Sequence, residues 1–439
     1  MVFLSKSQAV SPPPDGDYAG GNTAEGQNAL LSLTTGTYNT ALGLYSLLSD
    51  STGKFNTGVG AGTLLVNTAD ENTATGAGTL LSNTTGTENA ALGTFSLFNN
   101  TTGSFNTATG SQTLFANTTG TENTANGTFA LNANTEGSFN TAIGAFALAD
   151  NTSGSENTAM GVNALFSNTA GGNTGIGANA LRANTTGFQN TAVGHSALFD
   201  NTVGTFNTAI GASALTLNTG DGNTACGNVT LFNNTGSNNT ALGNGAGTNL
   251  TTGNNNIDIG YIVGGVASES NTIRIGNSDI TATFITGISG ATASGGAAVF
   301  VNSNGKLGTS TSSVRFKEDI KPMGKASEAI LALKPVSFRY KKEIDPQGIA
   351  EFGLIAEEVE KINPDLIIRD REGKPQTVRY EQVNAMLLNE FLKEHAKVQR
   401  LEAALDAVNE RLKVQEAKID KVSGQIEFNR SAPQMVANH

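Results

Sequence analysis

One feature constrains the fold more than any other: a short motif returns every 16 or 17 residues through the first half of the chain. Each unit reads Asn-Thr-Ala-x-Gly, then a short apolar stretch, then Asn-Thr-Thr-Gly or a variant. Fifteen closing glycines run from Gly26 to Gly260, and an asparagine stands four residues before each of them. A fixed period of this kind indicates a repeat architecture.

A second column defines what the period means. Leucine stands four residues after the glycine in thirteen of the fifteen copies, from Leu30 to Leu231, so we expect leucine stacked on leucine. Such a unit is too short for a helix pair and too long for a heptad, but it suits one coil of a parallel β-solenoid. We therefore predict a mainly β fold with a solenoid over residues 22–276, roughly 70 Å long at about 4.8 Å per coil. Glycines and the Asn-Thr-Thr-Gly segments should form its corners, where positive φ and side-chain-to-backbone hydrogen bonds are needed.

The rod has several possible roles. A single leucine column is a thin core, which leaves open a monomeric solenoid or one that packs against copies of itself. The pattern N-T-A-I-G-x-x-A-L resembles the head repeats of trimeric autotransporter adhesins, which implies a β-roll assembled as a homotrimer. A polysaccharide-degrading spike needs paired carboxylates, and the acidic residues of the rod fall at irregular repeat positions. The many threonines keep an ice- or glycan-binding solenoid as an alternative.

Charge divides the chain into two parts. Residues 1–311 carry 5 Lys and Arg against 16 Asp and Glu, which accounts for the whole net charge of −11, whereas residues 312–439 carry 21 of each. The acidic part lacks the basic surface of a nucleic-acid binder, so no nucleic-acid partner is expected. Cys226 is the single cysteine and the three histidines are scattered, so we expect no disulfide framework, no metal site and no cofactor.

The two ends of the rod carry weaker signals. Residues 1–21 are expected to be disordered, and no signal peptide is visible in them. The sequence contains no run of about 18 apolar residues, so no membrane anchor is expected. Residues 277–311 are rich in Gly, Ser and Thr and are expected to form a neck or linker. An extracellular, cell-surface or virion-associated location is expected from the kind of protein rather than from a targeting signal.

A different module follows at residues 312–408. Three blocks define it: SSVRFKEDI at 312–320, FGLIAEEVEKINPDL at 352–366 and YEQVNAMLLNEFLKEH at 380–395. These blocks resemble the intramolecular chaperone domain of endosialidases and phage tail spikes, a family of self-cleaving serine peptidases. The resemblance implies a small α+β domain that drives trimer assembly and then cuts itself off.

The resemblance also implies the catalytic residues. The family nucleophile opens an S-D-x-R-x-K motif, which places it at Ser312, with Lys317 as the general base and Thr311–Ser312 as the scissile bond. A lysine accepts a proton only if desolvation lowers its pKa, which burial in a trimer interface would provide. Ser313 stands where the family has aspartate, so the choice between the adjacent serines stays open, as does an inert trimerisation tail. Any enzyme activity would be a single-turnover self-cleavage by a serine endopeptidase with a Ser/Lys dyad.

The chain ends in a heptad pattern over residues 391–427, which predicts a coiled coil. The seam comprises Phe391, Val398, Leu401, Leu405, Val408, Leu412, Ile419, Val422 and Ile426. A helix packed on its own domain is the alternative, and the number three comes from the resemblance alone. Together these features predict a trimeric fibre or adhesin-like surface protein, with a cell-surface glycan or protein as receptor.

Overall fold

The structure is a computed structural model that describes residues 19–430 except 287, 289–293, 303–304 and 371. The chain divides into two compact units, Met1–Ile285 and Thr286–His439, which are described separately. Residues 19–21 form a turn, and the rest of the segment expected to be disordered, 1–18, lies outside the described residues. The expected neck, 277–311, crosses the boundary between the units and is only partly described.

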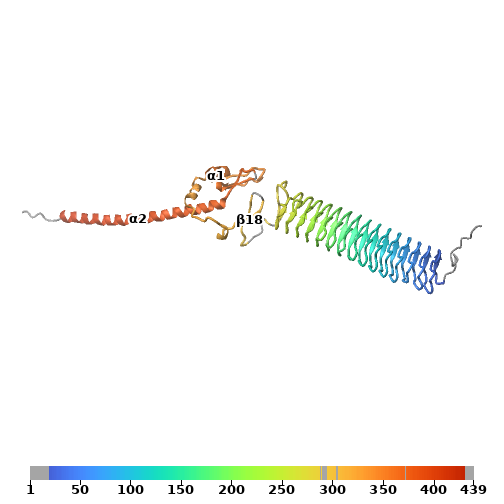
Figure 1. Cartoon of the computed structure of the whole chain (residues 1–439). Coiled ribbons are helices and arrows are strands. Elements are labelled where there is room, and N and C mark those ends of the chain that lie inside the picture. The colour runs from blue at the N-terminus through green and yellow to red at the C-terminus, as the bar shows by residue number, and fades with distance from the viewer. Residues whose placement is uncertain (1–18, 287, 289–293, 303–304, 371, 431–439) are drawn as a thin grey trace, which may run out of the picture. The chain divides into compact units, whose positions relative to one another are not determined.

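The first unit contains a parallel β-solenoid, as the repeat predicted. Its three-residue strands form one 16-stranded parallel sheet in chain order, each paired with the strand one repeat away, and Figure 1 shows the stacked coils. The strands are β1 Thr23–Glu25, β2 Thr40–Leu42, β3 Thr57–Val59, β4 Thr73–Thr75, β5 Ala90–Leu92, β6 Thr107–Thr109, β7 Thr124–Asn126, β8 Thr141–Ile143, β9 Thr158–Met160, β10 Thr174–Ile176, β11 Thr191–Val193, β12 Thr208–Ile210, β13 Thr224–Cys226, β14 Thr240–Leu242, β15 Ile257–Ile259 and β16 Ile273–Ile275.

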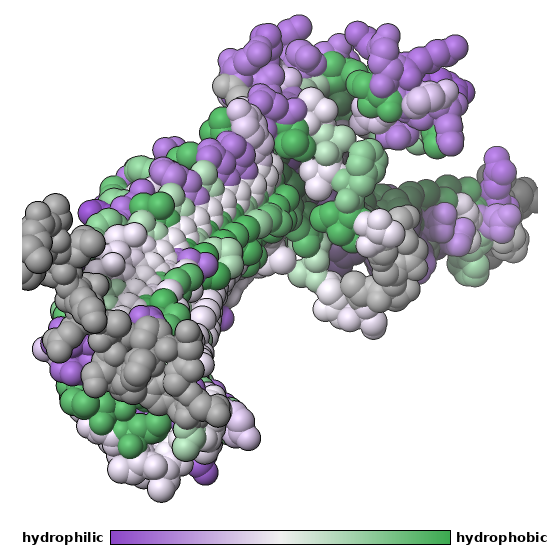
Figure 2. Space-filling view, turned by 90° about the vertical axis from the view of Figure 1, so that its right-hand side faces the viewer, coloured by the Kyte–Doolittle hydropathy of each residue, from purple (hydrophilic) through white to green (hydrophobic). Residues whose placement is uncertain are grey.

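The core of the rod is the predicted leucine column together with alanines. Because side chains alternate along a strand, the middle residue of Thr-Ala-x points inward, and Ala125 and Ala142 are fully buried. The first and third residues point outward, and Figure 2 shows apolar side chains in lines along the rod. The fully buried leucines of this column are Leu47, Leu64, Leu80, Leu97, Leu114, Leu131, Leu148, Leu165, Leu181, Leu198, Leu215 and Leu231.

These core leucines have an unusual backbone. Leu131 has φ of 50° and Leu148 of 53°, in the left-handed region that normally favours glycine. This conformation costs about 1–2 kcal/mol for an L-residue, whereas burying a leucine side chain gains about 1.5–3 kcal/mol. The leucine therefore sits on the inside of a tight corner, and its burial offsets the backbone strain.

The repeat glycines allow the coils to stack. Gly127 has φ of 142°, and a Cβ there would lie 2.5 Å from the carbonyl oxygen of Gly144 in the next coil. Gly120, in an Asn-Thr-Thr-Gly segment, meets a similar limit, because a Cβ would lie 2.4 Å from the carbonyl oxygen of Gly137. A side chain at either position would push neighbouring coils apart.

Two buried asparagine ladders run through the same core. In the ladder before the strands, the backbone N–H of Asn123 donates to Oδ1 of Asn106 (3.1 Å), and its Nδ2 donates to the carbonyl oxygen of Gly137 (2.9 Å). In the Asn-Thr-Thr-Gly ladder, Nδ2 of Asn134 donates to Oδ1 of Asn117 (2.8 Å) and to the same carbonyl oxygen (2.9 Å). All four of these asparagine side chains are fully buried and hydrogen-bonded, as buried polar groups must be.

The second unit is a small α+β domain that ends in a long helix. Its elements are β17 Val299–Val301 and β18 Leu307–Thr309, η1 Val314–Phe316, η2 Gly324–Ala332, β19 Val336–Phe338 and β20 Glu351–Gly353, α1 Ala356–Ile362, η3 Pro364–Leu366, β21 Ile367–Arg369 and β22 Pro375–Val378, and α2 Tyr380–Arg430. The strand pairs β17–β18, β19–β20 and β21–β22 are antiparallel. The buried core consists of Val359, Leu366, Ile367, Val378 and Met386.

The expected long helix is present as α2, which has 51 residues. Its seam is exposed in the single chain, from 47 % for Val398 to 65 % for Phe391. Met386 is its one buried residue, near the start of the helix. Pairing of this seam with other copies therefore stays a prediction.

Candidate active site

The structure brings the two expected catalytic side chains together. Nζ of Lys317 lies 3.1 Å from Oγ of Ser312, at hydrogen-bonding distance. A general base must reach the hydroxyl proton that it removes within about 2.6–3.2 Å, and this pair meets that condition. Thr311, whose carbonyl precedes the serine, lies in the same exposed segment, which has no regular secondary structure.

A single turn of 3₁₀ helix returns the lysine to the serine. In η1, the N–H of Phe316 donates to the carbonyl oxygen of Ser313 (3.1 Å), and the N–H of Lys317 donates to that of Val314 (3.2 Å). Ser313 is the N-cap of η1, and its Oγ accepts a hydrogen bond from the N–H of Arg315. The five-residue spacing of the motif thus corresponds to one capped turn.

The surroundings of the dyad are exposed and apolar. Ser312 and Lys317 are both exposed in the single chain. Val314 is 70 % exposed, Phe316 65 % and Ile320 66 %, so large apolar side chains flank the pair in sequence without being buried. The single chain therefore provides the Ser/Lys contact but little cover from water.

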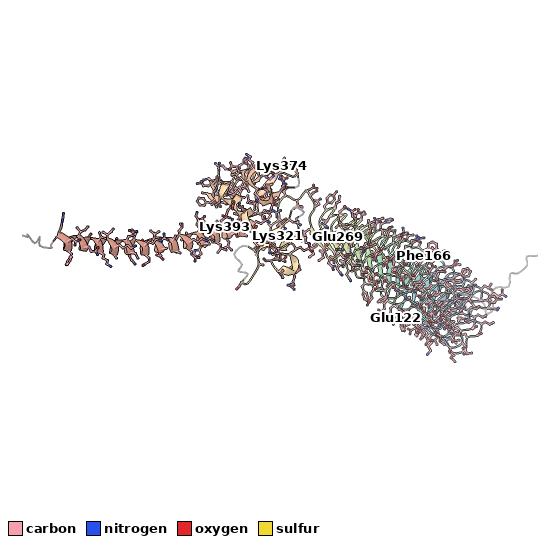
Figure 3. All side chains as sticks on the ribbon, turned by 60° about the vertical axis from the view of Figure 1, so that its left-hand side comes forward. Glu122, Phe166, Glu269, Lys321, Lys374 and Lys393 are labelled. Atoms are coloured by element: carbon pink, nitrogen blue, oxygen red, sulfur yellow. The ribbon has the colours of Figure 1, made fainter. Side chains whose placement is uncertain are left out.

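A polar cluster that the sequence analysis missed ties η2 to α2. Ser327 is fully buried, and Nδ2 of Asn389 donates to its Oγ (2.6 Å) while Nζ of Lys393 donates to Oε1 of Glu390 (2.6 Å). The hydrogen bond from Lys393 holds the pKa of Glu390 below its usual value. Lys393, labelled in Figure 3, also contacts Glu328 on η2. The spacing of Glu390 and Lys393, three residues apart on a helix, predicts that they pair with each other. Nothing in the sequence indicates Ser327 as their partner.

The last coils of the rod contain buried charge. Asp258 replaces the inward alanine of its strand, pairs in register with Ala241 and Arg274, and is 2 % exposed. Burial and the nearby carboxylate of Glu269 raise the pKa of Asp258 to about 6, while Arg274 acts in the opposite sense. Nε of Arg274 donates to Glu269 (2.8 Å), a residue labelled in Figure 3, and this hydrogen bond lowers the pKa of Glu269.

The rod carboxylates correct one expectation. Glu71, Glu88, Glu122 and Glu156 all stand five residues before a closing glycine, so the expectation of irregular positions is wrong for these four. All of them have positive φ and exposed side chains. A glycosidase acid needs an apolar environment that keeps it protonated, and exposed corner positions do not provide one.

The fold defines a class of protein: a β-solenoid rod followed by a small C-terminal α+β domain that begins with the Ser312–Lys317 contact. Residues 312–368 match the family described as chaperone of endosialidase. The match begins at Ser312 and includes Lys317, and it agrees with the family resemblance of the first two sequence blocks; the third block, 380–395, lies outside the matched residues. No curated protein matches the chain.

Two kinds of feature are absent from the described residues. No group of three or more His, Cys, Asp or Glu side chains among them is placed to hold a metal ion. None of their helices is both long enough and apolar enough to span a membrane.

Proposed function

We propose that the chain is a trimeric fibre or adhesin-like surface protein whose C-terminal domain gathers three copies, aligns their rods and then cleaves itself off between Thr311 and Ser312. The observation that carries this proposal is the 3.1 Å contact between Lys317 and Ser312 at the start of the segment that matches the chaperone family. The β-solenoid rod is the part that remains after cleavage.

The cleavage needs no cofactor. Oγ of Ser312 attacks the carbonyl carbon of Thr311 as its proton passes to the neutral amine of Lys317. The peptide C–N bond then breaks, and the lysine returns the proton to the departing amine of Ser312. The resulting ester between Thr311 and the serine oxygen is hydrolysed by water, which yields the carboxyl group of Thr311 and regenerates the hydroxyl.

Assembly would activate this dyad. An ammonium removed from water loses its proton more readily, whereas Lys317 is exposed in the single chain. Neighbouring apolar side chains such as Phe316 and the seam of α2 are exposed as well, and they offer other copies a surface to cover. Cleavage that waits for the trimer would prevent early loss of the assembly device.

A chaperone is useful here because the rod is repetitive. Parallel strands pair through non-local contacts, which close slowly. Neighbouring coils are so alike that a slip by one coil between chains would retain most contacts. A coiled coil over residues 391–427 would raise the local concentration of chains and fix their register before the rods form.

The location and receptor follow from the fibre proposal. We propose an extracellular, cell-surface or virion-associated protein, with a cell-surface glycan or protein bound along the rod. The threonines of the Asn-Thr-Thr-Gly segments do not favour ice binding, because hydroxyls such as that of Thr118 donate to a carbonyl oxygen of the next coil, here Thr135 (3.0 Å).

One gel tests the cleavage. The full chain of 45.0 kDa should yield fragments of 311 and 128 residues (439 − 311), and sequencing of the smaller one should begin at Ser312. Ser312→Ala and Lys317→Ala should each abolish cleavage and leave trimers intact, whereas Lys321→Ala, a nearby exposed lysine, should cleave normally. An intact chain in the wild type, or cleavage in the Ser312→Ala/Lys317→Ala double variant, would end the peptidase proposal and favour an uncleaved trimerisation tail.

A further inference from the structure

The two adjacent serines of the motif have different partners. Oγ of Ser312 contacts the amine of Lys317 (3.1 Å). Oγ of Ser313 instead accepts from the backbone N–H of Arg315 (3.4 Å) and from its Nε (3.2 Å). A guanidinium cannot accept a proton, because it carries donors only. The hydroxyl of Ser313 therefore has no general base within this turn.

We propose that Ser313 is a positioning residue for self-cleavage: it caps η1, and this capped turn holds Lys317 against Ser312. The inference rests on the proposed self-cleavage and adds a role for the residue that departs from the family motif. Aspartate and serine are both strong N-cap residues. Serine at this position therefore keeps the capping function, and its Oγ is not the nucleophile.

The turn depends on its cap because its other contacts are two backbone hydrogen bonds and the guanidinium of Arg315, which lies 5.4 Å from the centre of the Phe316 ring. A three-residue 3₁₀ helix is short, and two backbone hydrogen bonds close η1. Its residues Val314 and Phe316 are 70 % and 65 % exposed, so burial does little to hold the turn. The two contacts from Arg315 to Ser313 satisfy an N–H that the turn leaves without a backbone partner and fix the arginine side chain against the cap.

Loss of the cap should lower the fraction of chains in which the amine reaches the hydroxyl. Replacing an N-cap serine with alanine costs about 1 kcal/mol, which corresponds to a roughly fivefold change in that population. Ser313→Ala should therefore slow cleavage about fivefold. Ser313→Asp and Ser313→Thr, which keep a capping oxygen, should cleave within about twofold of the wild-type rate.

The test measures release of the 128-residue fragment over time from the full chain, pulse-labelled in cell-free synthesis. Ser310→Ala is the matched control, since it makes the same change beside the scissile bond outside η1, and it should cleave at the wild-type rate. Trimer content before cleavage is measured in a Ser312→Ala background, where Ser313→Ala should leave it unchanged. The small fragment from Ser313→Ala should still begin at Ser312.

The outcomes separate the two proposals. If the wild type releases no fragment, self-cleavage fails and the positioning role fails with it. If the wild type cleaves and Ser313→Ala keeps its full rate, the positioning role alone is overturned. The positioning role is also overturned if Ser313→Asp cleaves as slowly as Ser313→Ala, or if Ser313→Ala reduces trimer content. Cleavage in Ser312→Ala but not in Ser313→Ala would overturn it as well, because Ser313 would then be the nucleophile.

Discussion

Replacing one buried asparagine of the rod with aspartate, which has nearly the same size and shape, should strongly lower the free energy of unfolding. In Asn134→Asp the shape is retained, but Nδ2 becomes an oxygen. In the wild type, Nδ2 donates to Oδ1 of Asn117 (2.8 Å) and to the carbonyl oxygen of Gly137 (2.9 Å). After the substitution, a carboxylate oxygen would face two acceptors in a fully buried site.

The magnitude follows from the contacts. Leaving a buried polar group without its partner costs about 1–3 kcal/mol. Asn117 Oδ1 loses the donor from Asn134, whereas the carbonyl oxygen of Gly137 keeps the hydrogen bond from Asn123 (2.9 Å). Two lost donations together with a buried charge should lower the free energy of unfolding by about 4 kcal/mol or more.

The chain contains its own matched control. Asp50 occupies the same ladder position in an early coil, where the preceding coil has Leu33 instead of an asparagine, so no side-chain amide oxygen there requires a donor. Asp50 accepts from the N–H of Gly53 (2.8 Å) and from Nδ2 of Asn56 (3.0 Å). Burial raises the pKa of Asp50, so removing its charge carries little penalty. Asp50→Asn loses one accepted hydrogen bond, but Nδ2 of Asn56 still donates to the carbonyl oxygen of Ala69 (2.7 Å), so the cost should be about 1–2 kcal/mol, well below that of Asn134→Asp.

Chemical denaturation of the full chain, followed by circular dichroism of the β signal, measures both changes, and proteolysis in mid-rod locates the opening. Repeat rods can open locally, so protease sensitivity should rise near Asn134 before the whole rod unfolds. A stability within 1 kcal/mol of wild type for Asn134→Asp, or equal losses for both variants, would refute the ladder reasoning.

Three further predictions concern the core, the assembly device and the end of the rod. Leu131→Asp places a charge in the leucine column and should lower the free energy of unfolding by several kcal/mol. Thr135→Asp, at a half-buried corner, should lower it by about 1 kcal/mol, and equal losses for the two variants would contradict the register. Deletion from Phe391 onward should yield monomeric or aggregated rods by light scattering, and a soluble native-like trimer of residues 1–311 alone would count against the chaperone proposal. Because the pKa of Asp258 is about 6 in the fold against an ordinary 3.8, the folded state holds this proton more tightly, so rod stability should fall by roughly 2–3 kcal/mol as pH rises from about 3 to about 7. Asp258→Asn should remove this loss of stability. Glu269, whose pKa is lowered, should still make the rod less stable as pH falls further. If the melting temperature of Asp258→Asn depends on pH as in the wild type, Asp258 is not the cause of the loss.

The sequence predicted the rod because its period repeats the same environment many times. A column of leucines such as Leu114 and Leu131 has a simple meaning when the spacing is constant, and both side chains are buried. The pairing of Ser312 with Lys317 was also predicted, through the family motif rather than from the residues alone. The contact of 3.1 Å follows from one short turn, so local sequence was enough to bring the side chains together.

Other features depend on information that no short pattern carries. Propensity places leucine on a strand or helix, yet Leu131 has φ of 50° because closing a coil of so few residues requires tight corners. The Asn-Thr-Thr-Gly asparagines were expected to make side-chain-to-backbone hydrogen bonds, and Asn134 makes one to the carbonyl oxygen of Gly137. The pattern did not show that this side chain is fully buried, which depends on how the coil closes around it. Ser327 meets Asn389 across more than sixty residues, a contact set by the packing of η2 on α2.

The register of the rod is marked at its ends rather than along its length. In mid-rod, each coil offers the next the same asparagine and leucine columns, so a shift by one coil replaces each contact with an equivalent one. The exceptions in these two columns lie near the ends: Leu33 and Asp50 in the first coils, and Gly247 where the leucine column stops. The inward alanines, which glycine replaces at Gly58 and Gly175, give way near the same end to Asp258. A misaligned strand would therefore meet its penalty only after most coils had formed. Under the proposed function, a non-repeating C-terminal domain solves this problem, because it sets the alignment before the identical coils pair, and its removal afterwards leaves a rod whose coils already hold one another.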